Sequence, residues 1–247
     1  MRNYGSYALA NSSNPRCSNS LYQSLQTNLG ARKVDLDYGV DFLNLTFSNI
    51  PTAVSAAKKA GLAIIVLGTL SSFTHADLGF PGAQQQYLDA VLDASILAIW
   101  ILSGGQPFVL NDSTLRSNAI PRFFLCGEFT GDALADILTG EVNHSGKLPI
   151  SLPQDSSATP AFHDYHGRDD TGTADSLLGS HSTYQFPLLL RDTPMPFGFG
   201  LGYTTFSVSI PIVEAENEVI GMRLNITNTG SIPGEEVVQI YHRPHRG

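Results

Sequence analysis

The sequence is short of charge, cysteine and long apolar runs. Only 15% of its 247 residues are charged, and its first 127 residues hold no glutamate. Its apolar runs, such as Leu62 to Leu67, have the length of a buried strand, and none approaches the roughly 20 residues that a bilayer-spanning helix needs. The sequence therefore argues against a membrane span. The two cysteines, Cys17 and Cys126, leave open whether they pair in an oxidising compartment or stay buried as thiols.

The charge balance narrows the classes of partner. Lysine and arginine number 14 against 22 aspartates and glutamates, which gives a net charge of −8. That sign disfavours nucleic acid and anionic membrane as partners. Carbohydrate is neutral, so charge neither favours nor opposes it. With 42% hydrophobic residues, the composition is that of a soluble globular protein of one large domain, or one domain and a small second one.

The N-terminus carries no apolar core segment after Met1, so we expect no signal peptide within this chain. The triplet Asn-x-Ser/Thr nevertheless occurs five times, which favours a secreted full-length protein. The alternative is that a chain rich in serine, threonine and asparagine forms such triplets by composition. The candidate N-glycosylation sites are Asn11, Asn44, Asn111, Asn143 and Asn225.

Apolar periodicity predicts alternating helices and strands. Their order is typical of an α/β fold, an open and mainly parallel sheet with helices on both faces. The predicted helices are Leu21 to Leu29, Pro51 to Ala60 and Gln84 to Ala94. The predicted strands are Val34 to Val40 as an exposed or edge strand, Leu62 to Leu67, Ile96 to Leu102, Phe108 to Leu110 and Phe123 to Cys126.

The segment Gly127 to Pro153 predicts a helix, a turn and an extended stretch in succession. Its helical stripe is formed by Ala133, Leu134, Ile137 and Leu138. We expect Thr130 or Gly131 to cap the start of this helix and Gly140 to end it. The prolines in Leu148 to Pro153 exclude a central strand there.

The C-terminal part changes character. Residues 154–195 lack periodicity and predict a long loop. Alternating patterns at Arg223 to Thr227 and Glu236 to Tyr241, around a turn at Asn228 to Gly230, predict the first strands of an all-β module. We expect a first domain at 1–206 and a truncated all-β segment at 207–247, because a complete β-sandwich needs about seven strands.

Four segments resemble one known family. GEFTGDALADILTGEVNHSGKLPISLP, from Gly127 to Pro153, resembles the C-terminal α/β sandwich domain of glycoside hydrolase family 3, the β-glucosidases and β-xylosidases. LGFPGAQ, from Leu78 to Gln84, resembles the family's Leu-Pro-Gly-x-Gln turn. PFGFGLGYTTF, from Pro196, is similar to the junction into the last domain, and NITNTGSIPGEEVVQIY, from Asn225, is similar to the opening of the fibronectin type III-like domain that follows.

The resemblance implies retaining hydrolysis of terminal β-D-xylose or β-D-glucose from plant cell-wall oligosaccharides. This chemistry uses two carboxyl groups about 5–5.5 Å apart. In the family the nucleophile is an aspartate on an N-terminal barrel of roughly 250 residues. Nothing in residues 1–60 resembles that barrel, so we expect the nucleophile to lie outside this chain and the isolated chain to be inactive. The oligosaccharide substrate would be shared with the barrel domain.

The family's acid/base residue is usually a glutamate on the loop before the Leu-Pro-Gly-x-Gln turn. Here that loop, Gly68 to Asp77, has no glutamate. His75 and Asp77 are the candidate catalytic pair for proton transfer. The alternative is that they are two polar residues on a surface loop.

The remaining candidates for catalytic, metal-binding or cofactor-binding residues are weaker. Glu128, between a predicted strand and a helix, is expected to be a scaffold residue, and Glu141, after the helix cap, is expected to be solvated. The histidines in 154–195, His163, His166 and His181, match no regular ligand spacing, so we expect no metal. Gly198 to Gly202 is followed by no predicted helix, so we expect no dinucleotide cofactor. The alternative functions are a non-catalytic carbohydrate-binding or docking module, and a gene fragment that does not fold stably.

Overall fold

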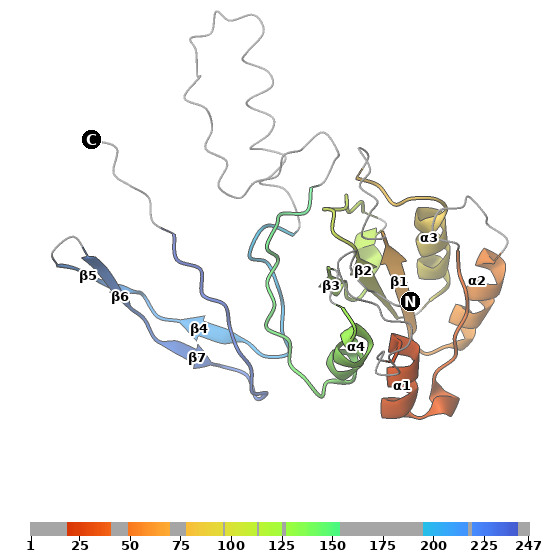
Figure 1. Cartoon of the computed structure of the whole chain (residues 1–247), viewed down its shortest axis with the longest axis horizontal. Helices are drawn as coiled ribbons and strands as arrows, with labels where there is room; N and C mark the ends of the chain where they lie inside the picture. Colours follow the sequence, from red (N-terminus) through yellow and green to blue (C-terminus); the bar gives the residue numbers. More distant parts are fainter. Residues whose placement is uncertain are drawn as a thin grey trace, which may run out of the picture.

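The computed structural model describes residues 19–40, 49–69, 78–95, 97–112, 114–124, 127–153, 195–216 and 219–241. An α/β body is followed by short antiparallel strand pairs that extend away from it (Figure 1). The helices are α1 (Leu21–Leu29), η1 (Ala31–Lys33), α2 (Ile50–Lys59), α3 (Gln84–Ala94), η2 (Thr114–Arg116) and α4 (Thr130–Thr139). The strands are β1 (Ala63–Gly68), β2 (Ala98–Ser103), β3 (Arg122–Phe123), β4 (Phe206–Val208), β5 (Ile212–Glu216), β6 (Val219–Arg223) and β7 (Ile226–Asn228).

The body is built on a parallel three-stranded sheet in the order β1-β2-β3. Ala63 pairs with Ala98 and Gly68 with Ser103, while Leu102 pairs with Arg122 on the other side of β2. All three strands therefore run in one direction, and their carboxyl ends meet at one edge.

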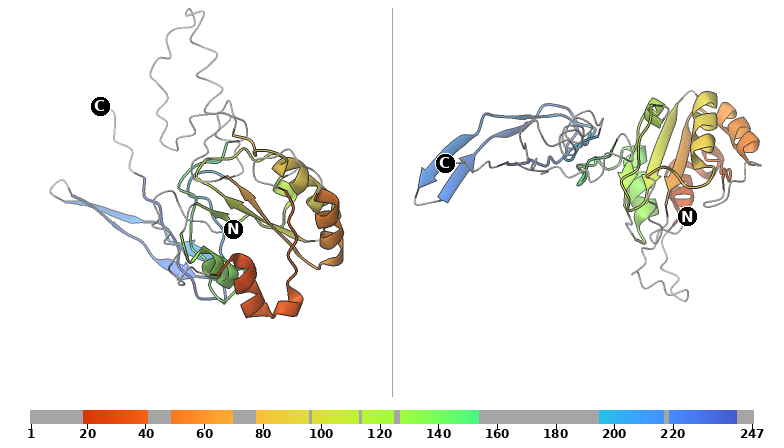
Figure 2. Two further views of the ribbon diagram at one scale, coloured as in Figure 1. Left: turned by 45° about the vertical axis from the view of Figure 1, so that its right-hand side comes forward. Right: turned by 90° about the horizontal axis from the view of Figure 1, so that it is seen from above.

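Side chains of the sheet alternate between two covered faces. Ile65, Trp100 and Leu102 lie in the core that includes residues of α2 and α3. Ile101 and Phe123 lie in a second cluster with Leu134 of α4, against which Leu21 of α1 packs. Two views of the ribbon show the helices on either side of the sheet (Figure 2). The predicted α/β sandwich is confirmed, because alternate residues of a strand point to opposite faces and both faces here are apolar.

The helices begin and end at residues that suit those positions. α1 starts with a capping box, in which the Ser20 hydroxyl accepts the Gln23 N–H and the Gln23 side chain accepts the Ser20 N–H. α2 has Pro51 in its first turn, and α4 ends at Gly140 with φ 82°. The predicted bounds of α1 and α3 are confirmed, and Gly140 ends α4 as predicted.

Several predictions were wrong. Residues 34–40 and 108–110 are irregular rather than strands, and 236–241 forms no strand among the described residues. The N-cap of α4 is Phe129, not Thr130 or Gly131. Thr130 lies inside the first turn, where its hydroxyl donates to the Gly127 carbonyl oxygen at 2.7 Å.

The β segments form two antiparallel pairs. β4 pairs with β7, and β5 pairs with β6. Their apolar side chains are exposed, among them Val208, Ile212 and Ile226. The boundary at residue 206 stays a prediction. Of the helices that the structure describes, none is both long enough and apolar enough to cross a membrane.

Candidate functional site

The carboxyl edge of the sheet is the candidate site. In open α/β sheets, ligands bind beyond the carboxyl ends of the strands. Here the edge consists of Gly68 and Thr69 at the end of β1, residues 103–106 at the end of β2, and Phe123 and Phe124 at the end of β3. Hydrogen bonds to residues elsewhere in the described part of the chain hold the ends of β1 and β2 in place.

Gln84 fixes the end of β1. Its side-chain oxygen accepts the Gly68 N–H at 2.8 Å, and its side-chain nitrogen donates to the Gly68 carbonyl oxygen at 2.9 Å. Gln84 is 1% exposed, so both bonds are shielded from water. The motif LGFPGAQ thus contains a side chain that holds the start of the loop that follows residue 69.

Gly68 allows β1 and β2 to approach closely. Its φ is 151°, and a Cβ placed there would lie 1.6 Å from the carbonyl oxygen of Ser103. That oxygen accepts the Thr69 N–H at 3.0 Å. Only glycine fits this position, since any side chain would collide with the backbone of β2.

Thr69 contributes a buried hydroxyl beside the same strand ends. The residue is 4% exposed, and its Oγ1 has no hydrogen-bond partner among the described residues. Gly104 lies against it, because a Cβ on Gly104 would be 2.5 Å from Thr69 Oγ1. Native structures contain few buried polar groups without a partner, and a functional role is one explanation for such a group.

Arg122 holds the loop after β2. Its Nη2 donates to the carbonyl oxygens of Gln106 at 2.8 Å and Gly104 at 3.4 Å. The guanidinium carbon lies 4.6 Å from the centre of the Phe124 ring and 6.0 Å from that of Phe108. Burial lowers the pKa of Arg122 to about 10, so the group stays protonated at neutral pH.

The described residues on either side of segment 70–77 are held by contacts with the core. After it, the Leu78 carbonyl oxygen accepts the Val109 N–H at 3.0 Å. Phe80 stacks on Phe108 with ring centres 4.7 Å apart and meets Trp100 edge-on at 5.3 Å. Both ends of this loop are therefore anchored on the core beneath the carboxyl edge.

The predicted catalytic residues His75 and Asp77 belong to this loop and lie outside the described residues, so their pairing stays a prediction. The same applies to Cys17, Cys126, Asn11 and Asn44, and to the histidines of 154–194. Glu128 lies exposed in the turn between β3 and α4, and Glu141 is exposed after Gly140. Among the described residues, no group of three His, Cys, Asp or Glu side chains is close enough to hold a metal ion.

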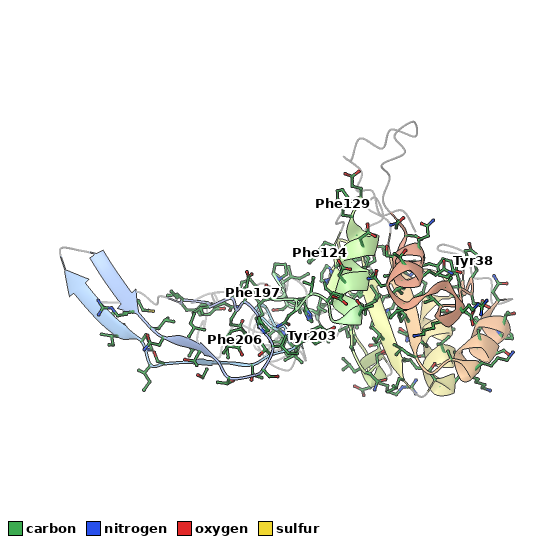
Figure 3. The ribbon with its side chains drawn as sticks, turned by 90° about the horizontal axis from the view of Figure 1, so that it is seen from below. Tyr38, Phe124, Phe129, Phe197, Tyr203 and Phe206 are labelled. Atoms are coloured by element: carbon green, nitrogen blue, oxygen red, sulfur yellow. The ribbon has the colours of Figure 1, made fainter. Side chains whose placement is uncertain are left out.

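A second polar cluster joins the body to the β segments. We call it the junction and define it as residues 143–152, 195–206 and 233–236. Residues 148–152 and 195–199 exchange backbone hydrogen bonds, among them Leu148 N–H to Phe199 O at 2.8 Å, and the segments run side by side (Figure 1). Phe197, Tyr203 and Phe206 lie in this region (Figure 3).

Lys147 and Glu236 form the ion pair of the junction, with Nζ and Oε1 2.9 Å apart. Lys147 Nζ also donates to the Gly200 carbonyl oxygen at 2.8 Å. The hydrogen bond from Lys147 holds the pKa of the Glu236 carboxyl below its ordinary value. Asn143 adds two bonds, because its amide nitrogen donates to the Pro233 carbonyl oxygen and its oxygen accepts the Tyr203 N–H.

Sequence reasoning missed the roles of Gln84 and Arg122. Gln84 stood in a motif that the resemblance singled out, so its position was marked although its partner was not. No sequence signal marked Arg122, which sits beside aromatic residues in a strand of only two residues. Its partners, the carbonyl oxygens of Gly104 and Gln106, lie in the loop after β2, which the fold brings next to β3.

Comparisons with known proteins agree with this architecture. The family model described as "Glycosyl hydrolase family 3 C-terminal domain" matches residues 2–203, so the chain belongs to that family. A β-xylosidase of Formosa agariphila is 31% identical over 91% of this chain and 31% of its own length. A periplasmic β-glucosidase of Salmonella typhimurium is 30% identical over 82% of this chain and 29% of its own.

A solved β-glucosidase of Listeria innocua, in complex with isofagomine, shares the fold. It has a TM-score of 0.66 at 19% identity and covers 80% of this chain and 28% of that one. The chain therefore spans less than a third of the length of these relatives.

Proposed function

We propose that this chain is the sandwich part of a secreted, retaining β-glycosidase that removes terminal β-D-xylose or β-D-glucose from plant cell-wall oligosaccharides. The observation that carries the proposal is the family match over residues 2–203, joined to relatives called β-xylosidase and β-glucosidase. The substrate would lie between the carboxyl edge of the sheet and a barrel that supplies the nucleophilic aspartate.

The geometry of the edge suits a supporting role in such a site. Retaining hydrolysis needs a nucleophile and a proton donor on either side of the glycosidic oxygen, about 5–5.5 Å apart. Gln84 holds Gly68, before the segment that carries His75 and Asp77, and a hydrogen bond to Val109 holds Leu78, after that segment. Within this proposal His75 donates and recovers the proton, and Asp77 orients the imidazole.

The sequence also supports a second function. The loop from Gly68 to Asp77 has no glutamate, the residue that usually serves as acid/base in this family. A sandwich without that residue would suit a non-catalytic module that binds carbohydrate or docks to a partner.

Assays of 4-nitrophenyl β-xyloside and β-glucoside test the proposal in two forms of the protein. The chain alone is expected to give no turnover, because it lacks the nucleophile. The longer protein that contains this chain is expected to hydrolyse at least one of the two with retention. Turnover by the chain alone, or none by the longer protein, would contradict the proposal.

Substitutions in the longer protein separate the two functions. His75→Ala is expected to lower kcat by about 10²–10⁴-fold, the range for loss of a general acid. Ser72→Ala, on the same loop, is the control. Calorimetric titration of the chain with xylo- and cello-oligosaccharides tests the module. Binding of an oligosaccharide by the chain, together with full activity of His75→Ala in the longer protein, would favour the non-catalytic module.

A further inference from the structure

The described residues contain three Asn-x-Ser/Thr acceptor asparagines, Asn111, Asn143 and Asn225, and the structure separates two of them sharply. In N-glycosylation the amide nitrogen of asparagine attacks the anomeric carbon of a lipid diphosphate-linked oligosaccharide. A nitrogen–carbon bond forms, the bond from that carbon to the diphosphate oxygen breaks, and the nitrogen loses one proton. The product is a bulky, hydrophilic group on the asparagine side chain. A folded chain accommodates it only where that nitrogen faces solvent.

Asn143 has no room for such a group. Its Nδ2 donates to the Pro233 carbonyl oxygen at 3.0 Å, and its Oδ1 accepts the Tyr203 N–H at 2.8 Å. Backbone closes around it, because a Cβ on Gly234 would lie 2.5 Å from Nδ2 and one on Gly202 would lie 3.2 Å from Oδ1. A sugar on Nδ2 would occupy the space of Gly234 and would separate the β segments from the body.

Asn225 presents the opposite situation. It lies exposed in the two-residue link between β6 and β7, and only its backbone groups are bonded. The Asn225 N–H donates to Ser209 Oγ, and the Asn225 carbonyl oxygen accepts the Ser209 N–H, each at 2.9 Å. Within the described part of the chain, its carboxamide has no hydrogen-bond partner. The Thr227 side chain is likewise exposed on β7.

We propose that Asn225 carries an N-linked glycan in the secreted protein and that Asn143, although it lies in the same kind of triplet, is a structural residue that stays unmodified. The proposal rests on the secretion proposed above and not on the glycosidase activity.

The test uses variants that remove each triplet without touching the asparagine. A background with Ser13→Ala, Thr46→Ala and Ser113→Ala leaves only the triplets of Asn143 and Asn225. The whole chain is placed behind a secretion signal in a yeast host and analysed by mass spectrometry before and after enzymatic removal of N-glycans. We expect one glycan on the secreted chain, lost with Thr227→Ala and retained with Ser145→Ala.

Two outcomes overturn the proposal. One is a secreted, trypsin-resistant chain with a glycan on Asn143. The other is an unmodified Asn225 while a glycoprotein secreted by the same cells carries its own glycan. If the cells do not export the chain, it is translated in the presence of microsomes, and the fraction of chains with a glycan on Asn225 is measured. An unmodified Asn225 in that experiment also overturns the proposal. Because neither measurement uses activity, failure here is distinct from failure of the proposed hydrolysis.

Discussion

Gln84 bonds to both backbone groups of Gly68, accepting its N–H at 2.8 Å and donating to its carbonyl oxygen at 2.9 Å. Among the described strands β1 has a neighbour only in β2, so this one buried side chain bonds Gly68 on its other side, just before the segment that carries His75. The first turn of α3 and the end of β1 are locked together by these two bonds.

Removing the Gln84 side chain should lower the stability of the folded chain. Gln84→Ala leaves the Gly68 N–H and carbonyl buried without these partners, which costs about 1–3 kcal/mol for each group. We expect the free energy of unfolding to fall by roughly 3 kcal/mol, measured by urea denaturation. Gln86→Ala, on the exposed side of the same helix, is the matched control and should change stability by less than about 0.5 kcal/mol. Equal effects of the two variants would show that the bonds to Gly68 contribute nothing.

Gln84→Glu keeps the shape and removes a donor. An ionised carboxylate cannot donate to the Gly68 carbonyl oxygen, and burial raises the pKa of such a group. The folded-state pKa then exceeds the unfolded one, so the variant should be most stable at low pH and lose stability as pH rises through the raised value. The difference in stability between the variant and the parent, followed from pH 4 to pH 8, checks this. A difference that does not change with pH would contradict it.

Gly68→Ala should be more damaging than any other glycine substitution near the edge. The new methyl would meet the Ser103 carbonyl oxygen at 1.6 Å, and φ 151° is unfavourable for alanine. We expect a loss of at least about 3 kcal/mol in the free energy of unfolding, or no folded protein. Gly105→Ala is the control, because a Cβ there meets nothing within 4 Å. A folded Gly68→Ala variant with parental stability would mean that β1 and β2 are further apart than described.

Arg122→Met should cost little stability although it removes two hydrogen bonds. Those bonds are worth roughly 0.5–1.5 kcal/mol each. Against them, the pKa of Arg122, lowered by burial to about 10, indicates that burial penalises the charge by roughly 3 kcal/mol. We expect stability within about 2 kcal/mol of the parent by chemical denaturation, because the two effects nearly cancel. Arg122→Ala, which also loses the contact with Phe124, should be less stable than Arg122→Met. A loss above about 2 kcal/mol in Arg122→Met would show that the loop bonds outweigh the buried charge.

Much of the body could be predicted because its signals are local. α1 and α3 were predicted to the residue, since their apolar spacing is helical and each is bounded by residues that stop a helix. The two faces of the sheet followed from continuous apolar runs. The family followed from four short segments in order, and the model match over residues 2–203 confirms it.

The strand predicted at residues 34–40 was wrong because the alternation of apolar and acidic residues there has another cause. Residues 34–40 alternate as a strand does, but Gly39 packs against Tyr87 of α3, so closely that a Cβ would lie 2.2 Å from the Tyr87 ring. Because the segment lies against α3, burial and then the charge of Asp37 raise the pKa of Tyr87. Alternation shows only that a segment has two different sides, and it does not identify what either side meets.

The site was the least predictable part, because its contacts join distant residues. Gln84 and Gly68 are 16 positions apart, and Lys147 and Glu236 are 89. Neither pair leaves a local pattern in the sequence. The motif around Gln84 marked the residue through family resemblance alone, and its contact with Gly68 arises only from the folded arrangement of β1 and α3.

The ion pair of Lys147 and Glu236 predicts a pH-dependent junction. The pKa of Glu236 is lowered by the hydrogen bond from Lys147, so the pair stabilises the folded chain above the ordinary carboxyl pKa and is lost as pH falls through the lowered value. The pair is partly exposed, and we expect it to contribute no more than about 1 kcal/mol. Acidification from pH 7 to pH 3 should therefore lower the protection of Leu148 and Gly198 against amide hydrogen exchange, taken relative to the intrinsic exchange rate at each pH, because their N–H groups bond across the junction. Glu236→Gln should show raised exchange at pH 7 and a weaker response to acid, whereas the exposed neighbour Glu235→Gln should behave as the parent does. An acid response of the parent that Glu236→Gln shares in full would assign the effect to another carboxyl group.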